Sequence, residues 1–195
     1  MRGRERRLND TTPGRKSIET LEPLAEAVIE GVESSGWELS GFQKTTSEEF
    51  RGRWAGESTR SAYLFFHRSD LGEGVSVDAF LDETTRGLRG NLALVLDGPL
   101  LGELPPPHEI LTMAGRASSW CLPEGYITPI TLRLALPEGE DEPWEAEAEL
   151  RFKLTLPRTA LAAGASAVSA LASATADAFG TLLEEVVAKG FKPVD

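Results

Sequence analysis

The sequence has very little of the chemistry from which most catalytic and metal sites are built. Its 195 residues include one cysteine, Cys121, and two histidines, His67 and His108. A single cysteine excludes an internal disulfide and a zinc site made of cysteines. The histidines are far apart in the sequence, and neither stands in a His-Glu-x-x-His pattern. We therefore expect no metal and no cofactor.

Long, strongly hydrophobic segments are also missing. The run 160–176 has no charged residue, but it is rich in Ala and Ser, contains Gly164 and is followed by Asp177. Membrane insertion depends on Leu, Ile, Phe and Val, which are sparse in this run. We therefore expect a buried helix and no membrane span. The N-terminus is charged and lacks the apolar segment of a signal peptide, so we expect a cytoplasmic protein.

Positive charge is scarce relative to negative charge. The chain has 20 Lys and Arg against 31 Asp and Glu, a net charge of −11, which opposes binding to nucleic acid. Basic residues gather in 1–16, which has almost no apolar residue and is expected to be a disordered basic tail. Acidic residues gather in 138–149. Without a repeat or a second core pattern, residues 17–195 are expected to form a single α+β domain.

The most regular pattern present is that of a long C-terminal helix. Apolar residues recur at alternating spacings of four and three between 161 and 186, and they therefore form one stripe along a helix. Thr159 is a candidate N-cap and Gly190 a candidate stop. This helix, from Thr159 to Gly190, is expected to cross a whole sheet, or to bend at Gly164 or Gly180.

A shorter amphipathic helix and a series of strands precede it. The helix is expected to begin at Ser17 and to end at Ser34-Ser35-Gly36. Five segments then have strand patterns, namely 37–45, 49–56, 61–67, 75–82 and 88–97. Their short connections predict an antiparallel meander. Segment 61–67 is apolar at successive positions, so we expect it to lie centrally with cover on both faces.

The segments 130–136 and 144–156 alternate as the two strands of a hairpin. If Leu136 lies opposite Trp144, then Leu132 meets Ala148 and Arg133 meets Glu147, an opposite-charge pair. One face of this hairpin is apolar and the other is charged. The fold expected is therefore α+β, with an antiparallel sheet of about seven strands, a five-strand meander plus a hairpin, packed against a long C-terminal helix and a shorter N-terminal helix.

Cys121, with His108 or His67 as its base, is the candidate for a catalytic thiol site. A nucleophilic cysteine needs a base, and imidazole is the usual one. The order of His108 and Cys121 after a Pro-rich segment resembles the corresponding region of ubiquitin-conjugating enzymes, although the His-Pro-Asn signature is missing here. A thiol enzyme is the third of three functional hypotheses.

Aromatic residues on the strands suggest a ligand cavity as the second hypothesis. A sheet closed by a long helix resembles the helix-grip folds, and this resemblance implies a small apolar ligand held between sheet and helix. The expected lining consists of strand and helix residues, Trp54, Tyr63, Phe65, Leu171, Thr175 and Phe179.

The leading hypothesis is a non-catalytic binding or adaptor protein that recognises another protein. It rests on the lack of a catalytic motif, on the acidic charge and on segments with no place in a core. These segments are the basic tail, the connector 104–107 and the acidic hairpin loop. In size and charge the chain resembles secretion chaperones and toxin-neutralising immunity proteins, which implies recognition through a complementary charged face.

Overall fold

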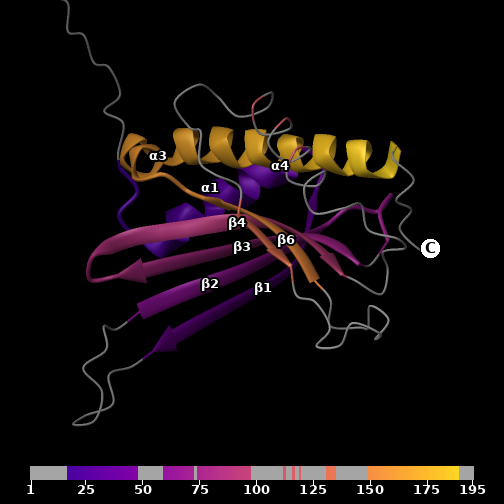
Figure 1. The fold of residues 1–195 in the computed structure, drawn as a ribbon. Helices are drawn as coiled ribbons and strands as arrows, with labels where there is room; N and C mark the ends of the chain where they lie inside the picture. The colour runs from indigo at the N-terminus through magenta and orange to yellow at the C-terminus, as the bar shows by residue number, and fades with distance from the viewer. Residues whose placement is uncertain are drawn as a thin grey trace, which may run out of the picture.

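The computed structural model describes residues 17–47, 59–72, 74–97, 131–134 and 149–188, and the single positions 112, 116 and 119. Six strands form one antiparallel sheet, and the helices lie over one of its faces (Figure 1). The predicted α+β class with an antiparallel sheet is therefore confirmed. The described residues give six strands and do not support a count of about seven.

The first four described strands form a meander, in which each pairs antiparallel with the next. They are β1 (Glu38–Ser47), β2 (Thr59–His67), β3 (Val75–Thr84) and β4 (Gly87–Asp97). The strand predicted at 49–56 lies outside the described residues. β1 forms one edge of the described sheet, with β2 next to it.

The hairpin of β5 (Thr131–Leu134) and β6 (Glu149–Thr155) completes the sheet, in the order β1-β2-β3-β4-β6-β5. Its predicted register is wrong, because Leu134 lies opposite Leu150, and Arg133 opposite Arg151 in place of Glu147. The displacement is by an even number of residues, and Phe152 and Leu154 lie on the buried face that the alternation predicts. β6 also pairs with β4, so its position depends on a neighbour that the hairpin pattern alone does not include.

Gly164 divides the predicted C-terminal helix into α3 (Arg158–Ala163) and α4 (Ala165–Ala188). Its φ of 99° is accessible to glycine at little cost, and the N–H groups of Ala167 and Val168 donate to its carbonyl to start α4. Of the two positions proposed for a bend, the break falls at Gly164, and α4 continues through Gly180. Thr159 lies inside α3 and is not its N-cap, which is Pro157.

The N-terminal helix α1 (Leu21–Glu33) begins later than predicted. Thr20 occupies the N-cap position but makes no side-chain capping bond. The backbone N–H of Leu21 donates to Oε2 of Glu83 on β3 at 2.8 Å. A carboxylate from the sheet thus satisfies one of the free N–H groups at the start of α1 and favours negative charge there.

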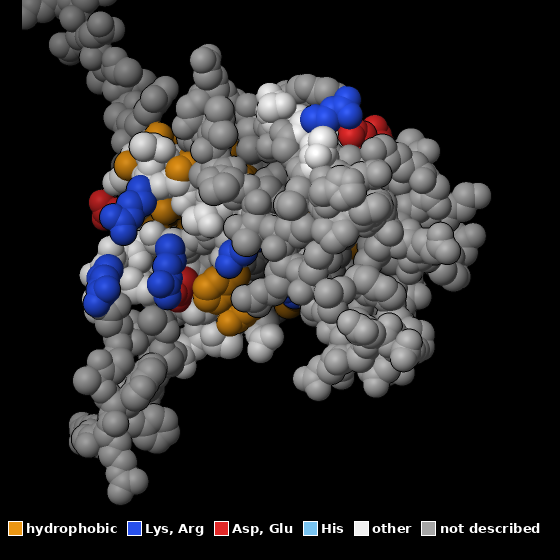
Figure 2. Space-filling model, in the orientation of Figure 1, with side chains coloured by type: hydrophobic (Ala, Val, Ile, Leu, Met, Phe, Trp, Pro, Cys, Tyr) orange, Lys and Arg blue, Asp and Glu red, His pale blue; other side chains and the backbone are white. Residues whose placement is uncertain are grey.

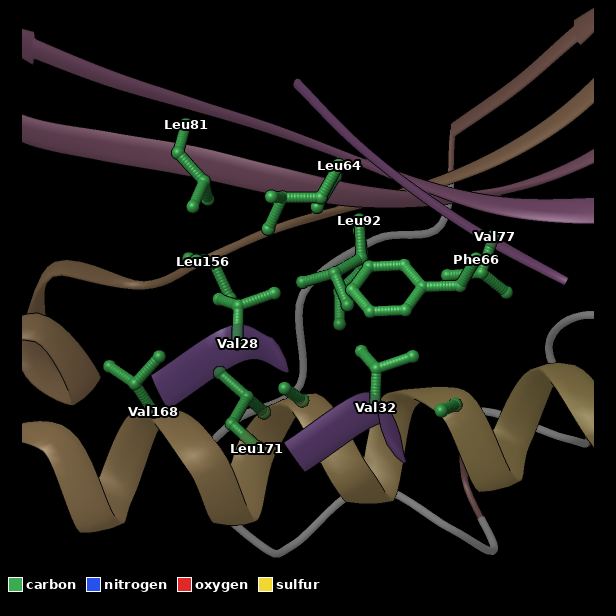
Figure 3. Packing of buried hydrophobic residues seen from close by; sticks show 14 of the residues in the cluster. Val28, Val32, Leu64, Phe66, Val77, Leu81, Leu92, Leu156, Val168 and Leu171 are labelled. Atoms are coloured by element: carbon green, nitrogen blue, oxygen red, sulfur yellow. The ribbon is translucent and has the colours of Figure 1, made fainter. Parts of the chain in front are cut away.

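A single continuous core joins one face of the sheet to α1, α3 and α4 (Figure 3). Figure 3 shows side chains from the helices meeting side chains from the strands, among them Val28, Val32, Val168, Leu171, Leu64, Phe66 and Leu92. α1 contacts both the sheet and α4. None of the described helices is long and apolar enough to cross a membrane.

Candidate binding face of the sheet

The face of the sheet that points away from the core, here called the outer face, exposes aromatic side chains. On β2, Leu64 and Phe66 are 0% exposed, whereas Tyr63 and Phe65 are each 37% exposed. Side chains alternate between the two faces of a strand, so the helices cover only the first pair. The prediction that 61–67 is covered on both faces is therefore wrong for Tyr63 and Phe65.

Strand pairing places four outer-face residues in one row across the sheet. Phe65 lies opposite Asp78, Asp78 opposite Ala93, and Ala93 opposite Lys153. Ala93 is the smallest side chain of this row and is only 3% exposed. The row crosses a pocket of about 400 Å³, whose lining is Tyr63, Phe65, Asp78, Ala79, Phe80, Asn91, Ala93, Arg151 and Lys153.

One wall of the pocket is aromatic. Tyr63 lies opposite Phe80 in the neighbouring row, and their ring centroids are 4.9 Å apart with a tilt of 48° between the ring planes. The centroid distance lies within the range of interacting aromatic pairs. Phe65 follows Tyr63 on the same face of β2. The three rings together offer a partly exposed apolar surface on one side of the pocket.

The opposite wall is basic. Lys153 is exposed and has no ion-pair partner among the residues that the structure describes. Arg151 lies two residues away on the same face of β6, with its Nη2 atom 3.7 Å from Oδ2 of Asp78. The side-chain amide of Asn91 completes this side of the pocket. The pocket therefore combines an apolar surface with an available positive charge.

Asp78 is the acidic group between these two walls. Burial raises the pKa of Asp78 above its ordinary value, and the hydrogen bond from Ser76 and the charge of Arg151 act in the opposite direction. The Ser76 hydroxyl donates to Oδ1 of Asp78 at 2.9 Å. Asp78 thus already has a hydrogen-bond donor and a nearby cation, but burial is the larger effect and disfavours its negative charge.

A second carboxylate on the outer face, Asp82, has its partners in place. It is 2% exposed, and it accepts hydrogen bonds from the Ser61 hydroxyl at 2.8 Å and from Nε of Arg89 at 2.7 Å. Buried carboxylates need such partners.

Figure 2 shows Lys and Arg side chains next to an exposed hydrophobic cluster below the helices.

The residues predicted to line one ligand cavity are not brought together. Leu171, Thr175 and Phe179 are each 1% exposed in the core between the helices and the sheet. Tyr63 and Phe65 lie on the opposite face of the sheet. Trp54 lies outside the described residues, as do Cys121 and His108 of the predicted thiol site and residues 1–16 of the predicted tail.

Asp78, Ala93 and Lys153 line the pocket but were not predicted as site residues. Alternation along each strand assigns all three to the wet face, and that signal was present in the sequence. Their proximity depends on the pairing of β4 with β6, which brings Lys153 beside Ala93. Within the part of the chain that the structure describes, no group of three or more His, Cys, Asp or Glu residues is arranged to hold a metal ion.

A scan against protein-family models found no match for this chain, and searches of curated proteins and of solved structures found none either.

Proposed function

We propose that the protein is a non-catalytic binding protein that recognises another protein through the outer face of its sheet. The observation that carries this proposal is the exposure of Tyr63 and Phe65 beside Lys153, on the face that the helices leave uncovered. Exposed aromatic residues at a pocket, next to a cation, are typical of protein interaction sites. Buried by a partner, they would contribute the largest apolar contact on this face.

The charge distribution supports recognition by electrostatic complementarity. The chain as a whole is acidic, with a net charge of −11. At the pocket, by contrast, Arg151 and Lys153 stand beside a single carboxylate, Asp78. A local basic site on an acidic protein orients an approaching partner, because the rest of the surface repels the acidic region that this site attracts.

The polar contacts on the outer face favour binding over catalysis. Ser76 donates its hydrogen bond to Asp78, and Ser61 donates to Asp82, so neither hydroxyl is bonded to an imidazole. His67 lies against Glu38, with its Nε2 atom 3.8 Å from Oε2 of that residue. A serine nucleophile requires a base that takes its proton, and these contacts do not supply one.

The two other hypotheses are not proposed. A carrier of an apolar ligand needs space between sheet and α4, where Leu171, Thr175 and Phe179 are packed in the core. A thiol enzyme based on Cys121 remains a prediction, since Cys121 and His108 lie outside the described residues.

Affinity capture with outer-face variants tests the proposal. The double variant Tyr63→Ser/Phe65→Ser removes the exposed rings, and Phe42→Ser is the matched control. Phe42 is 49% exposed on β1 but alternates to the other face, opposite Leu64. We expect one protein to be retained in stoichiometric amount by the wild-type chain and by Phe42→Ser, and to be lost with the double variant. Equal retention by all three chains, or retention of no protein by any of them, would refute the proposal.

A further inference from the structure

We propose that the pocket at Ala93 receives an acidic segment of the partner, which places a large apolar side chain on the Tyr63–Phe80 rings and a carboxylate at Lys153. This inference rests on the proposed function and specifies the chemistry of the partner. It follows from the juxtaposition of an aromatic wall and a basic wall on one row of the sheet.

The size of the pocket fits side chains of a segment. Its volume of about 400 Å³ lies at the lower end of the range of small-molecule sites. The hollow exists because Ala93 lies between Asp78 and Lys153, both of which have longer side chains. A leucine at position 93, at the bottom of the pocket, would fill part of the pocket with its side chain. Position 93 is therefore where a steric block can be introduced with the smallest change to the surrounding surface.

The sign of the charge follows from which groups already have partners. Asp78 is engaged by Ser76 and Arg151, and its pKa is raised because burial disfavours its charged form. Lys153 has no ion-pair partner among the described residues. An incoming carboxylate gains Lys153 as a new partner, whereas an incoming cation would face both Lys153 and Arg151. The segment that fits is therefore acidic.

The spacing of the two walls sets the spacing of the two side chains. Tyr63 and Phe65 on β2 are separated from Lys153 on β6 by β3 and β4, so three strand intervals of about 4.8 Å each give about 14 Å between their backbones, and Phe80 on β3 is one interval closer. An extended segment advances roughly 3.3 Å per residue. The apolar residue and the acidic residue of the partner segment are thus expected within about four positions of each other.

The polar group between the walls also suits a peptide. The Asn91 amide lies in the row next to Ala93 and is half-buried in the pocket lining. An amide side chain presents both a donor and an acceptor, so it can bond the backbone of a segment that crosses the pocket. A free organic anion would need only Lys153 and the rings, without this contact.

Selection from a phage-displayed library of random peptides tests the inference. The bait is the full-length chain, and peptides that also bind the Ala93→Leu variant are removed. We expect the remaining peptides to be enriched in Asp or Glu within about four positions of Trp, Tyr or Phe. Enrichment of basic peptides, absence of any acidic preference, or the failure of Ala93→Leu to remove any binder would overturn the inference.

Charge variants of the bait give a second readout that does not depend on the folding of Ala93→Leu. Lys153→Glu is expected to weaken a selected peptide at least about tenfold, and Asp78→Asn is expected to strengthen it, because a nearby negative charge is removed. Lys44→Glu is the control, since Lys44 is exposed on β1 and lies toward Glu22 of α1. The opposite signs, with weakening by Asp78→Asn and strengthening by Lys153→Glu, would identify a cationic segment and refute the proposal.

The two proposals fail in different ways. If the double variant Tyr63→Ser/Phe65→Ser loses the captured protein while Lys153→Glu and Ala93→Leu retain it, the outer face binds a partner but the pocket chemistry is wrong. Benzoate and indole together supply a carboxylate and an aromatic ring as free small molecules. If they displace a selected peptide when each is present at the same concentration as the peptide, the site recognises a small anion and not a segment. If no protein is retained by the wild-type chain, the proposed function itself is wrong.

Discussion

Gly31 of α1 lies so close to Ser169 of α4 that a Cβ atom at position 31 would be 2.3 Å from the carbonyl oxygen of Ser169. The absence of a side chain at this point lets the two helix backbones approach each other. Three serines continue the contact, with the Ser34 hydroxyl 3.0 Å from that of Ser173 and the Ser35 hydroxyl donating to the Ser173 carbonyl at 3.1 Å. This helix pair lies over the inner face of the sheet.

Gly31→Ala is expected to destabilise the protein by about 1–3 kcal/mol, because the added methyl group overlaps backbone atoms that cannot turn aside. Gly180→Ala is the control, since the nearest atom to a Cβ there is Nη1 of Arg68 at 3.7 Å. Replacing glycine inside an open stretch of helix should stabilise the protein by about 0.5–1 kcal/mol. Urea denaturation of both variants checks this, and a gain in stability for Gly31→Ala would contradict the close contact.

Glu83 on β3 is expected to stabilise α1 through its hydrogen bond from the Leu21 N–H and its contact with Arg60, whose Nη1 atom is 3.3 Å from Oε2. Glu83→Ala should lower the free energy of unfolding by about 1 kcal/mol, the usual cost of losing a cap. Glu83→Gln keeps an acceptor oxygen and should cost less. Glu26→Ala, at an exposed position in the middle of α1, should change little. Equal effects of Glu83→Ala and Glu26→Ala in thermal unfolding would show that the capping contact is unimportant.

Asp78 is expected to make stability depend on pH in an unusual direction for a carboxylate. Burial raises the pKa of Asp78 in the folded protein above its ordinary value of 3.8, so the folded state binds more protons than the unfolded state between these two pKa values. The contribution of Asp78 to stability is therefore fully present below 3.8 and is lost as the pH rises through the folded-state pKa. Asp78→Asn lacks this loss, so its stability relative to wild type should improve between about pH 3 and pH 7.

Asp70→Asn is the control for this measurement, because the shift there has the opposite sign. The hydrogen bond from Arg68 lowers the pKa of Asp70, and the contribution of Asp70 is therefore lost as the pH falls. The stability of Asp70→Asn relative to wild type should thus worsen as the pH rises. Denaturation curves at several pH values give both differences. If the stability of Asp78→Asn relative to wild type also worsened with rising pH, the claim that burial raises the pKa of Asp78 would be contradicted.

The class of fold could be predicted because strand alternation and helical periodicity are local signals. The alternation of Val75, Val77 and Ala79 identified one buried face, and these residues are buried in the structure. The break at Gly164 was one of two glycine positions at which a bend was expected. In contrast, the Glu83 contact with Leu21 joins residues far apart in the sequence, and no local pattern marks such a cap.

The candidate site could be predicted only in part. Tyr63 and Phe65 were recognised, but segment 61–67 is apolar at successive positions, so its pattern does not show that helices cover one face only. The basic residues that face these rings across the pocket, Arg151 and Lys153, are placed there by the register between β6 and β4. The hairpin pattern of 130–156 does not encode how β6 pairs with β4, where Phe152 lies opposite Leu94. Lys153 reaches the pocket only in that register.

The most direct test of the account is photo-crosslinking with benzoylphenylalanine at position 65, compared with position 42, inside cells of the source organism. Both residues are exposed phenylalanines, and they lie on opposite faces of neighbouring strands. If the outer face binds a protein, position 65 should give one adduct of discrete mass that is absent at position 42 and is lost when Tyr63→Ser is added. No adduct at position 65, or the same adduct from both positions, would contradict the claim that the outer face is the binding surface.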